Sequence, residues 1–108
     1  MKEHNKLVRD KVVEIIESNG EQAIFYTISD DQKFFQALLD KDFEESQEFK
    51  QNPSLEELAD KLEVLYALAK TLGLSPDQIE AARLKKFDER GGFDERIFLE
   101  STSYETVL

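Results

Sequence analysis

The sequence has 108 residues, of which 40% are hydrophobic and 35% charged, and its formal net charge is −10. This length suits one domain with a single core, and the apolar fraction argues against a disordered chain. The negative charge disfavours nonspecific binding to DNA or RNA, and the lack of cysteine excludes disulfides, zinc–thiolate sites and a thiol nucleophile.

Histidine and long apolar stretches are also scarce. The single His4 cannot form a histidine metal cluster, and the first eleven residues contain no apolar core of signal-peptide length. No window approaches the roughly eighteen apolar residues of a membrane-spanning helix. We therefore expect a soluble, cytoplasmic protein whose partners include neither nucleic acid nor a membrane.

The first predicted helix covers residues 5–18, where apolar residues recur at helical spacing. The sequence Ser-Asn-Gly follows and predicts that the helix ends at Gly20. Residues 22–28 are rich in β-branched and aromatic side chains, which predicts either a short strand or an extended connector.

Two capping-box patterns predict the starts of the next two helices. Ser29, with glutamine three residues later, opens a helix that runs to about Lys50. Ser54, with glutamate three residues later, opens another that runs to about Leu72 and ends at Gly73.

A fourth helix is predicted to start at Ser75 and Pro76, because proline is well tolerated in the first turn, and to stop at Gly91 and Gly92. No repeat or low-complexity linker interrupts the chain. The sequence therefore predicts an all-α fold, a bundle of about four helices, in one domain that spans residues 1–108.

Helical-wheel positions show which carboxylates of the second helix face its apolar side. Glu45 falls within an arc of phenylalanine and leucine residues and Glu48 lies near the edge of that arc, whereas Glu44 points away and is expected to be solvated. An ionised carboxylate that faces a core is costly unless a positive charge meets it. Asp42 also falls inside the arc, and the pattern gives no account of it.

The third helix has two apolar lines. One is a leucine stripe, and the other begins with Glu57 and Asp60 and continues through Val64. We therefore expect this helix to be covered on two sides, partly by a second copy of the chain. Glu57 has an alternative role, since a capping-box glutamate can reach back to the Ser54 amide, but Asp60 is too far along the helix for that.

The acidic pairs Glu45 with Glu48 and Glu57 with Asp60 each lie on one helix face, where like charges cost a few tenths of a kcal/mol. A hard divalent cation would explain them, because Mg²⁺ takes oxygen ligands and needs no histidine. Two antiparallel helices that carry these pairs would form a four-carboxylate cup for Mg²⁺, or for Mn²⁺ in its place.

The fourth helix carries a basic line, Arg83, Lys86 and Arg90, in register with Ile79. An alternative is pairing within the helix, with Glu80 opposite Arg83. The cations also repel one another, and an anion would relieve that repulsion. A cationic line near a metal cup is typical of a phosphate-ester site.

Four segments, in this order along the chain, resemble the MazG-like and phosphoribosyl-ATP pyrophosphohydrolase-like branch of the all-α nucleoside triphosphate pyrophosphohydrolases. They are NKLVRDKVVEIIESNG (5–20), EESQE (44–48), EELADKLEVLYALAKTLG (56–73) and ERGGFDERIFLE (89–100). Two departures from the family pattern are a spacer of only eight residues between the acidic motifs and DKVVEII in place of the more frequent DKIPEII.

The resemblance implies a helical, Mg²⁺-dependent enzyme, a homodimer or a tetramer formed as a dimer of dimers, that cuts a nucleoside triphosphate between the α- and β-phosphates. The products are a nucleoside monophosphate and pyrophosphate, and the role is house-cleaning of nucleotides. The resemblance assigns the metal-binding and catalytic roles to Glu45, Glu48, Glu57 and Asp60. It assigns phosphate contacts to Lys86 and Arg90, and a part in the site to Asn5, Lys6, Arg9 and Lys11. Arg83 is included as a substrate-binding residue because it lies on the same basic line as Lys86 and Arg90.

Two other functions stay open. A phosphoribosyl-ATP pyrophosphohydrolase of histidine biosynthesis shares this chemistry but not the substrate. A non-catalytic interaction module would use the acidic helices as a solvated surface for a basic partner. The position of Glu45 inside an apolar arc argues against the interaction module, and release of pyrophosphate from any nucleotide would exclude it.

Overall fold

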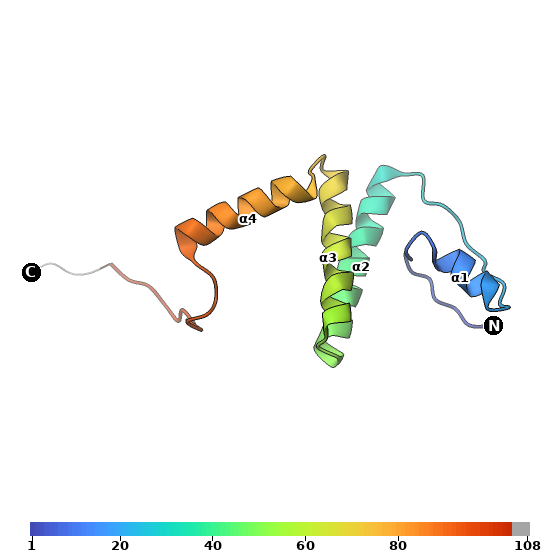
Figure 1. Ribbon diagram of the computed structural model, residues 1–108, viewed down its shortest axis with the longest axis horizontal. Coiled ribbons are helices and arrows are strands. Elements are labelled where there is room, and N and C mark those ends of the chain that lie inside the picture. Colours follow the sequence, from blue (N-terminus) through green and yellow to red (C-terminus); the bar gives the residue numbers. More distant parts are fainter. Residues whose placement is uncertain (105–108) are drawn as a thin grey trace, which may run out of the picture. The chain divides into compact units, whose positions relative to one another are not determined.

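The computed structural model describes residues 1–104, which contain four helices and no strand. The helices are α1 (Val12–Ser18), α2 (Asp31–Gln51), α3 (Leu55–Thr71) and α4 (Pro76–Arg90) (Figure 1). The all-α prediction is therefore confirmed for this part of the chain. None of these helices is long and apolar enough to span a membrane.

The chain divides into two compact units, Met1–Pro76 and Asp77–Leu108. The first unit contains α1, α2 and α3, and the second contains α4 from Asp77 onward and the segment that follows it. The prediction of a single domain stays a prediction.

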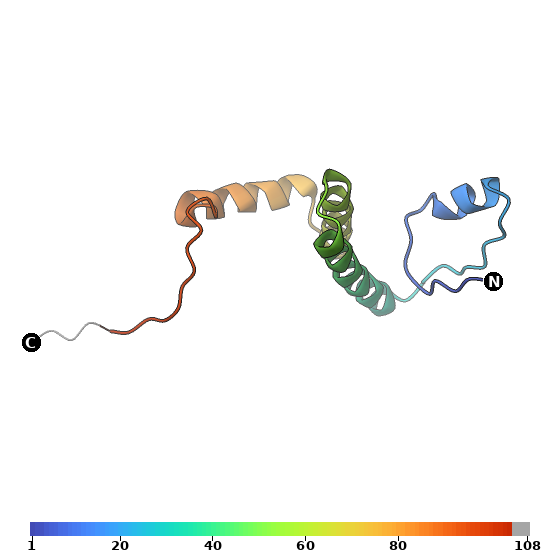
Figure 2. The same cartoon turned by 90° about the horizontal axis from the view of Figure 1, so that it is seen from below.

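α2 and α3 form an antiparallel helical hairpin, joined by a short turn at residues 52–54 (Figures 1 and 2). Asp30 caps α2, because its Oδ1 accepts a hydrogen bond of 3.0 Å from the Lys33 amide, so the predicted cap at Ser29 is wrong by one residue. Ser54 caps α3 as predicted, and its Oγ accepts a hydrogen bond of 3.2 Å from the Glu57 amide.

α1 is shorter than the predicted helix over residues 5–18. Residues 5–9 are not helical, and Asn5 adopts a left-handed conformation with φ of 48°, which asparagine tolerates better than most residues. This non-helical segment lets two basic side chains reach α2 and α3, as described below. The helix ends as predicted at Gly20, whose φ is 89°.

The ends of α1 and α3 share one hydrogen-bonding pattern. After α3, the Gly73 amide donates to the Lys70 carbonyl at 3.0 Å and the Leu74 amide donates to the Ala69 carbonyl at 2.9 Å. This is the Schellman motif, and its glycine takes the left-handed φ of 75° that the motif requires. The matching pair of bonds follows α1 at Gly20.

The segment 22–28 is an extended connector rather than a strand. Ile24, Phe25 and Tyr26 are exposed, and the described chain offers them no second strand with which to pair. Ile28 is half-buried and, with Tyr26, lines a hollow of about 310 Å³ beside the first turns of α2.

The apolar core of the described residues is small. Leu38 on α2 and Val64 and Ala69 on α3 are buried. The leucine stripe of α3 is exposed instead, with exposed fractions between 44% for Leu65 and 77% for Leu55. We call this stripe the leucine face: Leu55, Leu58, Leu62 and Leu65.

Asp42 lies beside the leucine face. It lines a groove of about 290 Å³ together with Leu58, Lys61, Leu62 and Leu65. Lys61 also places its ammonium 5.3 Å from the centre of the Phe49 ring, a cation–π contact between α3 and α2. Asp42 therefore lies at the edge of an apolar groove and is half-buried rather than part of the core.

Candidate metal centre

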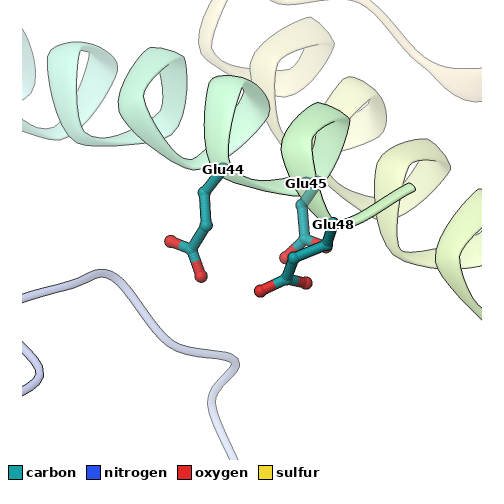
Figure 3. A group of neighbouring side chains, drawn as sticks. All are labelled: Glu44, Glu45 and Glu48. Atoms are coloured by element: carbon teal, nitrogen blue, oxygen red, sulfur yellow. The ribbon is translucent and has the colours of Figure 1, made fainter. Parts of the chain in front are cut away.

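Three glutamates of α2 lie together. Glu44, Glu45 and Glu48 each offer a carboxylate oxygen, and these oxygens all lie within 4.8 Å of one another. The three side chains leave α2 on one side, and the carboxylates of Glu45 and Glu48 are neighbours (Figure 3). Helical spacing of three and four residues produces this arrangement.

Glu45 also belongs to a second group, formed across the hairpin with Glu57 and Asp60 of α3, whose oxygens again lie within 4.8 Å of one another. The structure therefore brings the four predicted ligands into two overlapping groups that share Glu45. We call the five residues together the acidic cluster: Glu44, Glu45, Glu48, Glu57 and Asp60.

Burial distinguishes Glu45 from an ordinary helical glutamate. Only 5% of its surface is exposed, as the helical wheel predicts, and its Oε2 is buried without a hydrogen-bond partner. Glu57 Oε2 is also buried without a partner, so this oxygen does not take part in the helix cap. Buried carboxylate oxygens normally have partners, whereas these two have none within the described chain.

Lys41 is a cation that contacts two carboxylates of the cluster. Its Nζ lies 3.2 Å from Glu44 Oε1 and 3.3 Å from Glu45 Oε1, and its side chain is only 15% exposed. Lys41 is not among the site residues predicted from the sequence, although its spacing of three and four residues from the two glutamates is the signal that could have found it. Glu44, predicted to be solvated, is instead half-buried and paired.

The N-terminal segment supplies two further cations. Lys6 Nζ lies 3.4 Å from Glu44 Oε1, and Arg9 Nη2 lies 2.9 Å from Asp60 Oδ1. Of the predicted substrate residues in this segment, Lys6 and Arg9 therefore reach the acidic cluster. Asn5 and Lys11 make no hydrogen bond or ion pair to it within the described chain.

The charges shift the pKa values of the cluster in different directions. Burial is the main cause that raises the pKa of the Glu45 carboxyl, and Glu48 adds to the rise while Lys41 opposes it. Burial also tends to raise the pKa of Glu44, but the hydrogen bonds and positive charges of Lys41 and Lys6 outweigh it and lower that pKa.

Burial and neighbouring charges also act in opposite directions on the pKa of Lys41. Burial tends to lower the pKa of its ammonium, but the hydrogen bonds and negative charges of Glu44 and Glu45 outweigh burial and raise the pKa above its ordinary value. Lys41 is therefore a firmly charged ammonium group within the acidic cluster.

The basic residues of α4 belong to the second unit. Arg83 pairs within its own helix, where its Nη2 lies 2.6 Å and its Nε 2.9 Å from the Glu80 carboxylate oxygens. The alternative of intrahelical pairing is therefore confirmed for Arg83. Contacts of Lys86 and Arg90 with a substrate stay a prediction.

Three cations, Lys6, Arg9 and Lys41, thus face five carboxylates, which leaves two negative charges in excess. The oxygen-only donor set, the excess charge and the orphaned oxygens all suit a hard divalent cation.

In comparisons with known proteins, the chain matched no family model, no curated protein and no solved structure.

Proposed function

We propose that this chain is a Mg²⁺-dependent nucleoside triphosphate pyrophosphohydrolase that releases a nucleoside monophosphate and pyrophosphate. The observation that carries the proposal is the buried Glu45 carboxylate, which belongs to both carboxylate groups and whose Oε2 has no hydrogen-bond partner. A solvated acidic surface, as an interaction module would use, has no need of such an oxygen.

Glu45, Glu48, Glu57 and Asp60 would hold the metal, with Mg²⁺ or Mn²⁺ as the ion. Their oxygens are close enough together to share one or more cations, and like charges so placed are unfavourable without one. Glu44 is less suited to this role, because Lys41 and Lys6 both bind its Oε1.

A polyphosphate is the ligand that matches the surroundings of the cluster. Lys6 and Arg9 are attached to the non-helical N-terminal segment and are partly exposed, so both can turn from carboxylates to phosphate oxygens. Arginine binds phosphate through two parallel hydrogen bonds, which lysine cannot do. The sequence resemblance to pyrophosphohydrolases supports a nucleoside triphosphate as the substrate.

In the proposed reaction, a water oxygen attacks phosphorus and the bond between the phosphorus and the bridging oxygen of the α–β linkage breaks. When bound, the metal would lower the pKa of the attacking water and neutralise phosphate charge. A carboxylate oxygen of the cluster accepts the proton of the water. Arg9 and Lys6 orient the triphosphate and stabilise the charge of the departing pyrophosphate.

The test is a substrate screen with purified full-length chain and Mg²⁺. Canonical and damaged nucleoside triphosphates and phosphoribosyl-ATP are each assayed for pyrophosphate and monophosphate. Release of pyrophosphate from nucleoside triphosphates supports the proposal, whereas activity on phosphoribosyl-ATP alone assigns the histidine-pathway reaction. Stepwise release of orthophosphate refutes the proposal, and absence of any turnover favours the interaction module.

We also propose that the chain assembles as a homodimer or tetramer through the leucine face. Three buried apolar side chains among residues 1–104 are a small core for a stable fold, and four exposed leucines on one helix face leave much apolar area in water. Full burial of one leucine contributes roughly 1.5–3 kcal/mol. A second copy offers the same face, as a two-fold symmetric interface requires.

A further inference from the structure

We propose that Lys41 is a tethered counter-ion of the acidic cluster, which it neutralises in the metal-free chain and from which it withdraws when a divalent cation binds. This inference rests on the proposed metal site and concerns how the chain itself regulates that site. Lys41 then sets the metal affinity, and the site binds Mg²⁺ more weakly than its carboxylates alone would.

The first support is the depth of Lys41. Its side chain is 15% exposed, whereas those of Lys6 and Arg9 are 41% and 55% exposed. Of the three cations, Lys41 is thus the one least surrounded by water. A charge interacts more strongly with its neighbours where water is scarce. It also lies on α2, one turn before the glutamates that it binds, so the helix itself fixes its position.

The second support is that the two carboxylate oxygens of Glu45 have different surroundings. Lys41 lies 3.3 Å from Oε1, and Oε2 is the buried oxygen without a partner. One ammonium therefore offsets only part of the negative charge at this carboxylate. A divalent cation that binds near Oε2 would repel the Lys41 ammonium, since like charges a few ångströms apart repel strongly where water is scarce.

The third support is the lysine side chain itself. Its flexible four-carbon stem lets the ammonium leave the carboxylates while the methylene groups stay packed. Lys41 can therefore exchange places with a metal without rearrangement of α2, and its withdrawn ammonium is then available to other anions.

The test measures Mg²⁺ binding by isothermal titration calorimetry, and thermal stability in chelator by circular dichroism, with no nucleotide present. In Lys41→Met, which keeps the stem and removes the charge, Mg²⁺ should bind more tightly by about tenfold or more, because the repulsion between the metal and a unit positive charge a few ångströms away is removed. The same variant should melt at a lower temperature than the wild type in chelator, because Glu44 and Glu45 lose their counter-ion.

Two further variants make the test specific. Lys33→Met removes a lysine from the first turn of α2, outside the acidic cluster, and should leave Mg²⁺ affinity unchanged. Lys41→Arg keeps the positive charge and should bind Mg²⁺ within a few-fold of the wild type. If Lys41→Met is unfolded in chelator, Mg²⁺ should restore its helicity, and failure to do so would refute the inference.

Weaker Mg²⁺ binding by Lys41→Met would overturn the inference, because Lys41 would then hold Glu45 in place for the metal rather than compete with it. Unchanged binding would overturn it as well. Both outcomes would leave the proposed metal site standing. A wild-type chain that shows neither heat of binding nor thermal stabilisation with Mg²⁺ would instead refute the metal site, and this inference with it.

Discussion

Replacement of Asp60 by asparagine separates metal binding from simple charge crowding. Asp60 stands in the group that joins the two helices, and its Oδ1 accepts a hydrogen bond of 2.9 Å from Arg9. Both partners of that ion pair are substantially exposed, so its loss should cost no more than roughly 0.5 kcal/mol. Relief of repulsion from Glu57 is of similar size. The metal-free variant should therefore be about as stable as the wild type.

The difference should appear when Mg²⁺ is added. A ligand at about one hundred times its dissociation constant stabilises the folded state by roughly 2.7 kcal/mol. For a chain of this length, 1 kcal/mol corresponds to about 4–8 °C in melting temperature. Saturating Mg²⁺ should thus raise the melting temperature of the wild type by roughly 10–20 °C, whereas Asp60→Asn should lose most of that increase and most of its turnover.

The assay is thermal denaturation followed by circular dichroism, at one protein concentration, in chelator and in excess Mg²⁺. Asp40→Asn is the matched control, because Asp40 is an exposed carboxylate of α2 outside the acidic cluster, hydrogen-bonded to Gln36. It carries the same chemical change and should keep the full response. If Asp60→Asn retains both activity and the whole Mg²⁺-induced increase, the metal site is refuted.

Three further predictions concern assembly, pH and substrate binding. Light scattering at micromolar concentration should show a dimer or larger species, and Leu62→Glu should dissociate it; a fully active monomeric wild type would show that the leucine face needs no second copy. Burial raises the pKa of the Glu45 carboxyl in the folded chain above its ordinary value of 4.5. The free energy of unfolding therefore falls as pH rises from 4.5 to the higher pKa of the folded state, because the buried carboxyl loses its proton over that interval. In chelator, Glu45→Gln should therefore resist urea better than the wild type at pH 7.5 and equally well below pH 4.5, and a less stable variant at pH 7.5 would contradict this. Arg9→Gln should raise KM for the nucleotide without weakening Mg²⁺ binding, because Arg9 pairs with Asp60 at an exposed position and carries the same charge as the metal; weaker Mg²⁺ binding in calorimetry would show that Arg9 holds a ligand in place for the metal.

Features set by short stretches of sequence are well predicted. The cap at Ser54, the helix ends at Gly20 and Gly73 and the burial of Glu45 each depend on neighbours within a few residues or on one helix face. The wheel places Glu45 within the apolar arc, and Glu45 is buried together with Leu38 of that arc, although Phe43 of the same arc is exposed.

Features that depend on tertiary packing are not predicted. The wheel finds two apolar lines on α3 but cannot rank them, and the line that contains Val64 packs against α2 while the leucines of the other line are exposed. Residues 5–11 have helical periodicity, yet residues 5–9 are not helical in the structure. Lys6 and Arg9 of this segment form ion pairs with α2 and α3 instead. Glu44 forms an ion pair because Lys41 turns toward it. A helical wheel gives the directions of side chains but does not predict ion pairs between them.

The turn between α2 and α3 has a consequence for how the site can change over evolution. All five carboxylates lie between residues 44 and 60, within one hairpin closed by a turn of a few residues, so little chain entropy is lost in bringing them together. Contacts so local in sequence favour fast folding. The N-terminal segment and α4 lie outside this hairpin. Sequence changes in either can therefore accumulate while the five carboxylates of the acidic cluster are inherited together.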